Sequence, residues 1–252
     1  GIAVVSGHIP YLAKVVKAVM RTAAKVWTVG TGPGDNIRLL DARPESSGCR
    51  VRLSFKGRIH EYLFPVASIG LVRNSALAFA AIVAMGFDAE EASARMPHVR
   101  LPASVMQVEP LRTRSGALVT LVDDSWNAEV MSMRNAMSFV RSYRAPSGNA
   151  PVARKVGVLG RIVNLGEQAE AMHRGLAEPL LASGIAHLVT HGDEMRWLRE
   201  EVPASLLGPH FDNAAELTLY LGEFLRDGDL LLVKGDRDRS DFGTIPSLLK
   251  KL

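Results

Sequence analysis

The stretch "ALVTLVDDSWNAEVMSMRNAMSFV", residues 117–140, begins as an apolar strand and ends as a helix. The run up to Val122 is short and rich in Val and Leu, as buried strands are, and Glu129–Tyr143 has a helical pattern. The turn between them holds polar and aromatic residues, namely Asp123, Asp124, Ser125, Trp126 and Asn127. Such side chains at a strand end serve either the start of the next helix or a ligand, so this turn bears on both fold and function.

The same alternation of strand and helix fills the chain from Pro97 onward. The apolar runs "RKVGVLG", "IAHLVTHG" and "DLLLVKG" alternate with helical patterns. The predicted helices are Glu129–Tyr143, Glu167–Ser183, Asp193–Glu200 and Asn213–Leu225. We expect Pro179 to kink or split the second of them, because proline lacks the N–H that a helix interior needs. This alternation predicts an α/β fold with a Rossmann-like, mostly parallel C-terminal sheet flanked by helices.

The first part of the chain has a different pattern. The segments "NIRLLDA", "CRVRLSF" and "RIHEYLF" alternate apolar and polar residues, as half-exposed antiparallel strands do. An Ala-rich helical pattern follows over Gly70–Met85, and Asp88 is the expected N-cap of the next helix. We therefore expect a partial α/β domain with an antiparallel patch over residues 1–96, and a second domain over residues 97–252.

The first domain is too short in strands for a full sheet of this class. We expect it to expose apolar surface along Ile2–Ser6 and Val26–Val29, which would allow self-association. The chain also starts inside a predicted strand and without Met, which suggests a fragment.

Composition excludes several classes of protein. The net charge of +4 is mild and the 30 Lys and Arg residues are scattered, so nucleic-acid binding is not predicted. A single cysteine, Cys49, excludes an internal disulfide and fits a reducing cytoplasm. No run of about 18 apolar residues is present, so no membrane span is expected.

Four segments resemble, in order, the motifs of the Mur ligases. The turn segment "LVDDSWNAEVMSMRNAM" is similar to the family pattern "DDSYNANPxSMxxAL". The other three are "SIGLVRNSALAFAAIVAMGFDAEEA", "VGVLGRIVNLGEQAEAMHRGL" and "LRDGDLLLVKGDRD". The resemblance is nearest to the branch that joins D-alanyl-D-alanine to a UDP-muramoyl tripeptide, and with the opening segment it covers nearly the whole chain.

The resemblance implies part of an ATP-dependent amide ligase that uses Mg²⁺ and an acyl-phosphate intermediate. A P-loop needs G-x-x-x-x-G-K-[ST], and this sequence contains no Gly-Lys dipeptide. In the family the P-loop and magnesium ligands lie in upstream domains, which are the expected partners of this segment. We therefore expect residues 1–252 alone to be inactive and to hold no cofactor tightly. The implied ligands are a nucleotide and an amino-acid or peptide substrate.

The resemblance also assigns roles to particular side chains. Asp123 corresponds to an aspartate that binds the ATP ribose, and Asn127 to a nearby amide that binds the nucleotide. Arg100 corresponds to an arginine that reaches the phosphates. Lys234, with Asp124, is the candidate for binding the incoming substrate. No catalytic residue and no metal ligand is expected on this chain.

Simpler structural roles remain open for several of these residues. Arg100 and Lys234 can be solvated surface residues, and Asp124 can cap the helix that follows it. His173, on a predicted helix, is more simply a packing residue than a functional one. The run of alternating charges at 236–239 is most simply a solvated loop, although it stands where an amine-bearing substrate could be recognised.

The sequence departs from the family pattern inside the motifs. "GDMLELG" has become "GRIVNLG", which places Arg161 and Asn164 where the family has acids. The resemblance therefore allows a paralogue that joins other amino acids or peptides. It also allows a non-catalytic binding module. An unrelated Rossmann-like nucleotide binder is a third alternative, which the absence of G-x-G-x-x-G disfavours.

Overall fold

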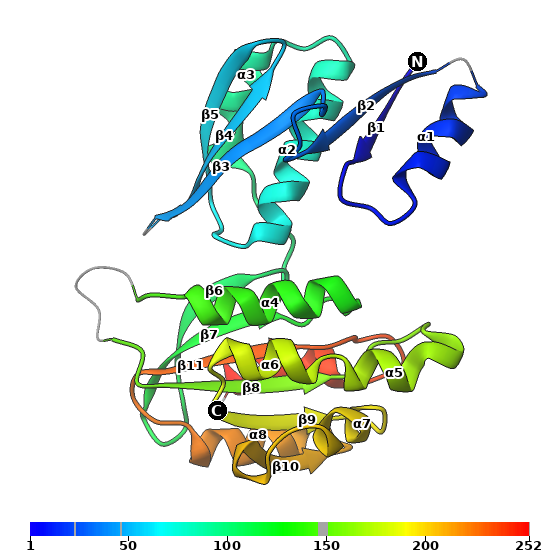
Figure 1. Ribbon diagram of the computed structural model, residues 1–252. Helices are drawn as coiled ribbons and strands as arrows, with labels where there is room; N and C mark the ends of the chain where they lie inside the picture. The colour runs from blue at the N-terminus through cyan, green and yellow to red at the C-terminus, as the bar shows by residue number, and fades with distance from the viewer. Residues whose placement is uncertain (23, 46, 146–150, 252) are drawn as a thin grey trace. The chain divides into compact units, whose positions relative to one another are not determined.

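The computed structural model describes residues 1–22, 24–45, 47–145 and 151–251 (Figure 1). The chain divides into two compact units, Gly1–Arg100 and Leu101–Leu252, which we call unit 1 and unit 2. The predicted boundary lay after Met96. The loop predicted at "PSGNAP" falls mostly on residues 146–150, outside the described part. Within the described ranges, no helix is both long and apolar enough to cross a membrane.

Unit 1 is a five-stranded sheet in the order β1-β2-β3-β4-β5. The first three strands pair in parallel and the last three in antiparallel fashion, which confirms the antiparallel patch. The strands are β1 (Ile2–Ser6), β2 (Lys25–Gly30), β3 (Ile37–Glu45), β4 (Gly48–Phe55) and β5 (Arg58–Phe64). The helices are α1 (Leu12–Met20), α2 (Ile69–Ala84), α3 (Ala89–Arg95) and the 3₁₀ turn η1 (Met96–His98).

The core of unit 1 lies between α2 and the antiparallel strands. Phe79 of α2 is fully buried and meets the ring of Phe55 edge-on. Asp88 caps α3 by accepting a hydrogen bond from the backbone N–H of Glu91, as predicted. Strand β1 is half-buried throughout, but Val29 of β2 is only 4% exposed, so the expected exposed surface does not extend over that residue.

Unit 2 is a six-stranded sheet in the order β10-β9-β8-β11-β7-β6. All neighbours are parallel except β6, which pairs antiparallel with β7, so the mostly parallel sheet is confirmed. The strands are β6 (Gln107–Arg112), β7 (Leu118–Asp124), β8 (Arg154–Gly160), β9 (His187–His191), β10 (Leu207–Phe211) and β11 (Asp229–Lys234).

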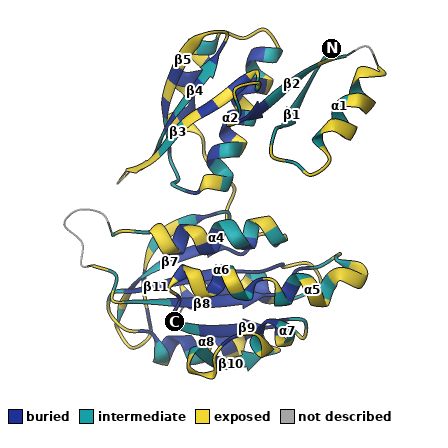
Figure 2. Ribbon diagram, viewed as in Figure 1, coloured by how far each residue is buried: buried dark blue, intermediate teal, exposed yellow. Residues whose placement is uncertain are grey.

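Helices flank the sheet of unit 2, and its central strands β7, β8, β9 and β11 are mostly buried (Figure 2). The helices are α4 (Val130–Ser142), α5 (Ala169–Arg174), α6 (Ala177–Ser183), α7 (Met195–Glu200), α8 (Ala214–Phe224) and α9 (Ile245–Leu249). Leu231 and Val233 of β11 share a core cluster with residues of α8 and α9. Because side chains alternate across a strand, Leu230, Leu232 and Lys234 of β11 face the opposite side of the sheet, where α4 packs.

The helical stretch predicted at 167–183 is divided in two. Helix α5 ends at Arg174, and α6 starts at Ala177. Pro179 therefore lies in the first turn of α6, where a missing N–H costs no helical hydrogen bond. The predicted split is confirmed.

Candidate functional site

The carboxyl ends of β7, β8 and β11 surround a cleft of about 780 Å³ in unit 2. Its lining residues come from the ends of all three strands, and they are Trp126, Asn127, Ala128, Glu129, Val163, Asn164, Asp236, Arg237, Asp238, Ser240, Gly243 and Thr244. Clefts of this size at this edge of an open parallel sheet are the usual location of ligand sites.

Glycines stand at the ends of two of these strands, Gly160 as the last residue of β8 and Gly235 immediately after β11. A Cβ added to Gly235 would lie 2.6 Å from the Cα of Gly160, and it would also collide with the ring of Phe242. The backbones of β8 and β11 therefore converge over that ring, and neither position tolerates a side chain.

Asp123 is buried at the end of β7, with 4% exposure. Its Oδ1 accepts hydrogen bonds from the backbone N–H and the hydroxyl of Ser125, at 3.1 and 2.7 Å. Its Oδ2 accepts one from the hydroxyl of Ser104 at 3.0 Å. In this structure Asp123 thus closes the turn after the strand.

Asp124 points to the other face of the sheet and forms an ion pair with Lys234. The Oδ2–Nζ distance is 2.9 Å, and Oδ1 accepts a hydrogen bond from the backbone N–H of Met106. Burial raises the pKa of the Asp124 carboxyl, while the Lys234 ammonium and the Met106 N–H offset part of that rise. The alternative that Asp124 caps the following helix is wrong, because its carboxylate is turned into this buried pair.

The N-cap of α4 is Glu129. Its carboxylate accepts hydrogen bonds from the backbone N–H groups of Met131 and Ser132, and the Ser132 hydroxyl accepts one from the backbone N–H of Glu129. This is a reciprocal capping box with the usual residue types exchanged, since the hydroxyl is normally at the cap and the carboxylate three residues later.

Lys234 is 2% exposed, so the alternative of a solvated lysine is wrong. Besides Asp124, its ammonium donates to the backbone carbonyl of Asn127 at 2.7 Å. The buried Lys234 ammonium therefore holds the turn after β7 in place through these two contacts. Asn127 itself is exposed in the cleft, where its side-chain oxygen accepts a hydrogen bond from the N–H of Ala128.

The segment after β11, residues 235–241, is the second wall of the cleft and is called here the β11 loop. The guanidinium of Arg237 lies 3.4 Å from the ring centroid of Trp126, which is 44% exposed. Asp236 is 3% exposed and accepts a hydrogen bond from the backbone N–H of Asp238 at 2.6 Å. Arg237, Asp238 and Arg239 are exposed, as the alternative of a solvated charge run expects, but Asp236 is buried and does not fit it.

His173 is a packing residue, as the simpler alternative held. The ring is fully buried, with Nε2 accepting a hydrogen bond from the backbone N–H of Ile162 and Nδ1 donating to the carbonyl of Ala169. Burial lowers the pKa of His173, so the neutral ring that this arrangement needs is favoured. It anchors the segment after β8 to α5.

Arg100 is exposed at the end of unit 1 and lies outside the cleft of unit 2. Asp123, Asp124, Asn127 and Lys234 do come together at one strand-end region, although only Asn127 among them lines the cleft. The sequence interpretation gave no specific role to Glu129, and it left Trp126 unassigned. A glutamate three residues before Ser132 was the available signal for the cap.

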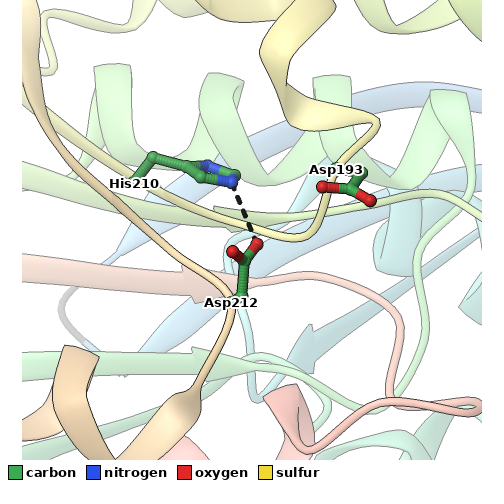
Figure 3. A group of neighbouring side chains, drawn as sticks. All are labelled: Asp193, His210 and Asp212. Carbon is green, nitrogen blue, oxygen red and sulfur yellow. Dashed lines mark ion pairs between the residues drawn. The ribbon is translucent and has the colours of Figure 1, made fainter.

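In the described ranges of the chain, one group brings three potential metal ligands together, namely Asp193, His210 and Asp212 (Figure 3). His210 Nε2 is 3.3 Å from Asp212 Oδ1, and its Nδ1 lies 2.9 Å from the Thr190 hydroxyl. Arg196 already pairs with Asp193 at 3.1 Å. Both carboxylates are exposed and Asp193 already pairs with a guanidinium, so we assign no metal ion to this group.

The fold and the cleft define unit 2 as a Rossmann-like α/β domain with its open site at the carboxyl ends of parallel strands. The family described as "Mur ligase, glutamate ligase domain" matches residues 108–237, just over half of the chain. The chain belongs to the Mur ligase family.

Solved structures of two relatives share the fold. MurF from Acinetobacter baumannii matches with a TM-score of 0.78 and 19% identity over 99% of this chain and 51% of its own. The MurF ligase from Thermotoga maritima in complex with ADP matches with a TM-score of 0.77 and 14% identity over 100% of this chain and 53% of its own. The chain thus spans about half the length of these relatives.

A sequence relative is likewise a ligase. The UDP-N-acetylmuramoyl-tripeptide–D-alanyl-D-alanine ligase of Rickettsia prowazekii (strain Madrid E) is 22% identical over 117 residues, which is 46% of this chain and 24% of the relative.

Proposed function

We propose that residues 1–252 form the nucleotide- and amine-binding part of an ATP-dependent amide ligase of the Mur type. The observation that carries the proposal is the cleft at the carboxyl ends of β7, β8 and β11, in a chain that belongs to this family. Unit 1 is then the later part of the central ATPase domain, and unit 2 the C-terminal domain. ATP and Mg²⁺ act in the complete enzyme.

The residues of the cleft fit a nucleotide on its β7 side. The exposed ring of Trp126 offers a face for a base, and the Asn127 amide offers a donor and an acceptor. Asp123 Oδ2 is held by one hydroxyl, that of Ser104. If a ribose hydroxyl replaces the Ser104 hydroxyl, Asp123 Oδ2 still accepts one hydrogen bond. Asp123 therefore remains the proposed ribose contact. Arg100 remains the proposed phosphate contact from unit 1.

The opposite wall fits an amine-bearing substrate. Asp238 brings a carboxylate to the cleft and Arg237 a guanidinium, both from the β11 loop. An amino acid or short peptide presents the matching ammonium and carboxylate groups. Asp124 and Lys234 act in this account through the turn that they support, because both are buried in their own ion pair.

In this proposal, positioning is the main contribution of these residues to amide formation. Holding the amine beside an activated carboxyl group turns an encounter of two molecules into a step within one complex. Residues 1–252 contain no Gly-Lys dipeptide and therefore no P-loop. In this proposal, another segment binds the ATP phosphates and activates the carboxyl group.

A titration with ADP tests the nucleotide half of the proposal. We expect binding by residues 1–252 with a Kd of roughly 1 mM, about −4 kcal/mol, since only part of the nucleotide site is present. Asn127→Ala should weaken it about tenfold, whereas Gln168→Ala, which removes an exposed amide outside the cleft, should leave it unchanged. Equal affinity of the two variants would remove Asn127 from the site.

The non-catalytic binding module remains the second candidate. The observation that favours it is the replacement of acids by Arg161 and Asn164 within a family motif. Amide formation by a longer protein that contains this chain separates the two, because the module predicts ligand binding without turnover.

A further inference from the structure

Arg161, immediately after β8, joins three segments at the edge of the cleft without lining the cleft itself. Its Nη2 donates hydrogen bonds to the backbone carbonyls of Asp238 and Arg239, at 3.3 and 3.0 Å. Its Nη1 is 3.5 Å from a carboxylate oxygen of Glu194. Its own carbonyl accepts a hydrogen bond from the backbone N–H of Asp236 at 3.1 Å. One residue therefore holds the β11 loop at several points.

The carbonyls that Arg161 holds belong to a part of the β11 loop with an unfavourable backbone. Arg239 has a φ of 53°, in the left-handed region that residues with a Cβ seldom adopt. A conformation of this kind persists only when surrounding contacts fix it. The charged N–H groups of Arg161 are such contacts, and charge-assisted hydrogen bonds are stronger than neutral ones.

The far end of the β11 loop is fixed separately. Asp241 lies with Oδ1 2.8 Å from His191 Nε2, and its Oδ2 accepts a hydrogen bond from the backbone N–H of Ala214. Among the described residues, the part between Asp236 and Arg239 is held by the hydrogen bonds of Arg161 and by the stacking of Arg237 on Trp126. This is the part that presents Arg237 and Asp238 to the cleft.

The position suits a long side chain with a planar head. The aliphatic stem of Arg161 runs beside Gly192, where an added Cβ would lie 3.5 Å from its Cδ. The guanidinium then reaches the two carbonyls of the β11 loop and the carboxylate of Glu194 from opposite sides. A carboxylate side chain at 161 has no donor for these carbonyls, and a lysine has no planar fork.

We propose that Arg161 is a positioning residue that sets the conformation of the β11 loop and thereby selects the amine-bearing ligand that the cleft accepts. Arg161 acts through the β11 loop that carries Arg237 and Asp238. On the β7 side of the cleft, Trp126 is coupled to this loop through its contact with Arg237, and among the described interactions Arg161 makes none with Asp123 or Asn127. The ligand class in this inference rests on the proposed function, whereas the ordering of the loop does not.

The test compares Arg161→Met, which keeps the stem and removes the donors, with Arg161→Lys. Arg174→Met is the matched control, because Arg174 also forms several ion pairs on unit 2 but with residues that do not line the cleft, namely Glu170, Glu200 and Glu201. The first readout is the ¹⁵N NMR spectrum of residues 1–252. The second is the affinity for two probes, D-alanyl-D-alanine and ADP.

In Arg161→Met, the amide resonances of Asp238 and Arg239 and the indole resonance of Trp126 should shift or broaden, while that of Trp27 in unit 1 stays in place. Affinity for D-alanyl-D-alanine should fall about tenfold or more, and affinity for ADP should change less than twofold. Arg161→Lys should be intermediate, and Arg174→Met should match the wild type in both readouts.

Wild-type loop resonances in a folded Arg161→Met protein would overturn the inference. So would an equal loss of affinity for both probes, because a general structural effect does not distinguish the two walls of the cleft. If the wild-type chain binds neither probe, the proposed function fails, and unchanged or changed loop resonances still decide whether Arg161 positions the loop.

Discussion

Asp124 and Lys234 are register partners on the neighbouring parallel strands β7 and β11, and the Lys234 Nζ lies 2.9 Å from the Asp124 Oδ2. Both are buried, and the lysine also holds the carbonyl of Asn127. The pair therefore connects the two strands that carry the opposite walls of the cleft. Removing either partner leaves an isolated charge in a buried place, which is much more costly than losing an exposed pair.

We predict that Asp124→Leu and Lys234→Met each lower the free energy of unfolding by about 3–5 kcal/mol. The double change Asp124→Leu with Lys234→Met should cost less than the sum of the single changes, because it leaves no unpaired charge. Urea unfolding of the four proteins measures this coupling. Glu109→Ala, which breaks the exposed pair with Lys250, is the control and should cost about 1 kcal/mol or less. Additive single effects at Asp124 and Lys234 would contradict a buried pair.

A second prediction concerns the start of α4. Glu129→Ala should lower the free energy of unfolding by about 0.5–2 kcal/mol, the usual range for a lost cap. Ser132→Ala should have a similar effect, and the two effects should not add, because each residue completes the same capping box. Met131→Ala, at an exposed neighbouring position, is the control for thermal unfolding. If Glu129→Ala leaves the free energy of unfolding unchanged, Glu129 does not stabilise α4 as its N-cap.

The buried His173 predicts a pH dependence of stability. Burial lowers its pKa below the ordinary 6.5, so between these two values the unfolded chain binds more protons than the folded protein. The stabilisation from His173 is therefore complete above pH 6.5 and is lost as the pH falls through the folded pKa. Proton NMR titration of the ring should give a midpoint below 6.5.

Stability against pH supplies the control for this prediction. His173→Gln should flatten the loss of stability below pH 6.5, whereas His8→Gln, at an exposed position, should not. A ring that titrates at or above 6.5 would mean that His173 is not held neutral by the contacts with Ile162 and Ala169.

The central strands of unit 2, β7, β8, β9 and β11, could be predicted from local sequence because each is a short apolar run with glycine or acid at its end. The edge strands β6 and β10 were not predicted, because "QVEPLR" and "LGPHF" each contain a proline and no apolar run. "VTLVDD", "KVGVLG" and "LLLVKG" end at the same edge of the sheet, and this placed the turn of Asp123 and Asn127 at the site. The family motifs added the assignment of the two domains and the expected ligand class.

The roles of individual side chains at that edge could not be predicted in the same way. The pairing of Asp124 with Lys234 depends on β11 lying beside β7, which residues 110 positions apart do not reveal by spacing. The contact of Trp126 with Arg237 has the same origin. At Glu129, the capping box runs in the reverse order of the common one, so an aspartate nearer the strand was the more obvious cap.

Residues 1–252 alone should not catalyse ligation. With ATP, Mg²⁺ and candidate amino acids or dipeptides, we expect neither amide product nor release of phosphate above background, since no P-loop lysine is available within this sequence. Mass spectrometry and a phosphate assay check the two products separately. Turnover by the purified chain would show that activation does not need another segment and would contradict the division of labour proposed above.

Residue-level mapping of ADP binding tests the central claim most directly. In a ¹⁵N NMR titration of residues 1–252, ADP should shift the resonances of Trp126 and Asn127 and the nearby lining of the cleft, with saturation at roughly millimolar concentration. Resonances of the glycine-rich turn at Gly30–Gly34 in unit 1 should stay in place. Saturable shifts at that turn with none at Trp126 and Asn127, or no saturable shifts at all, would contradict the assignment of the strand-end cleft as the nucleotide site.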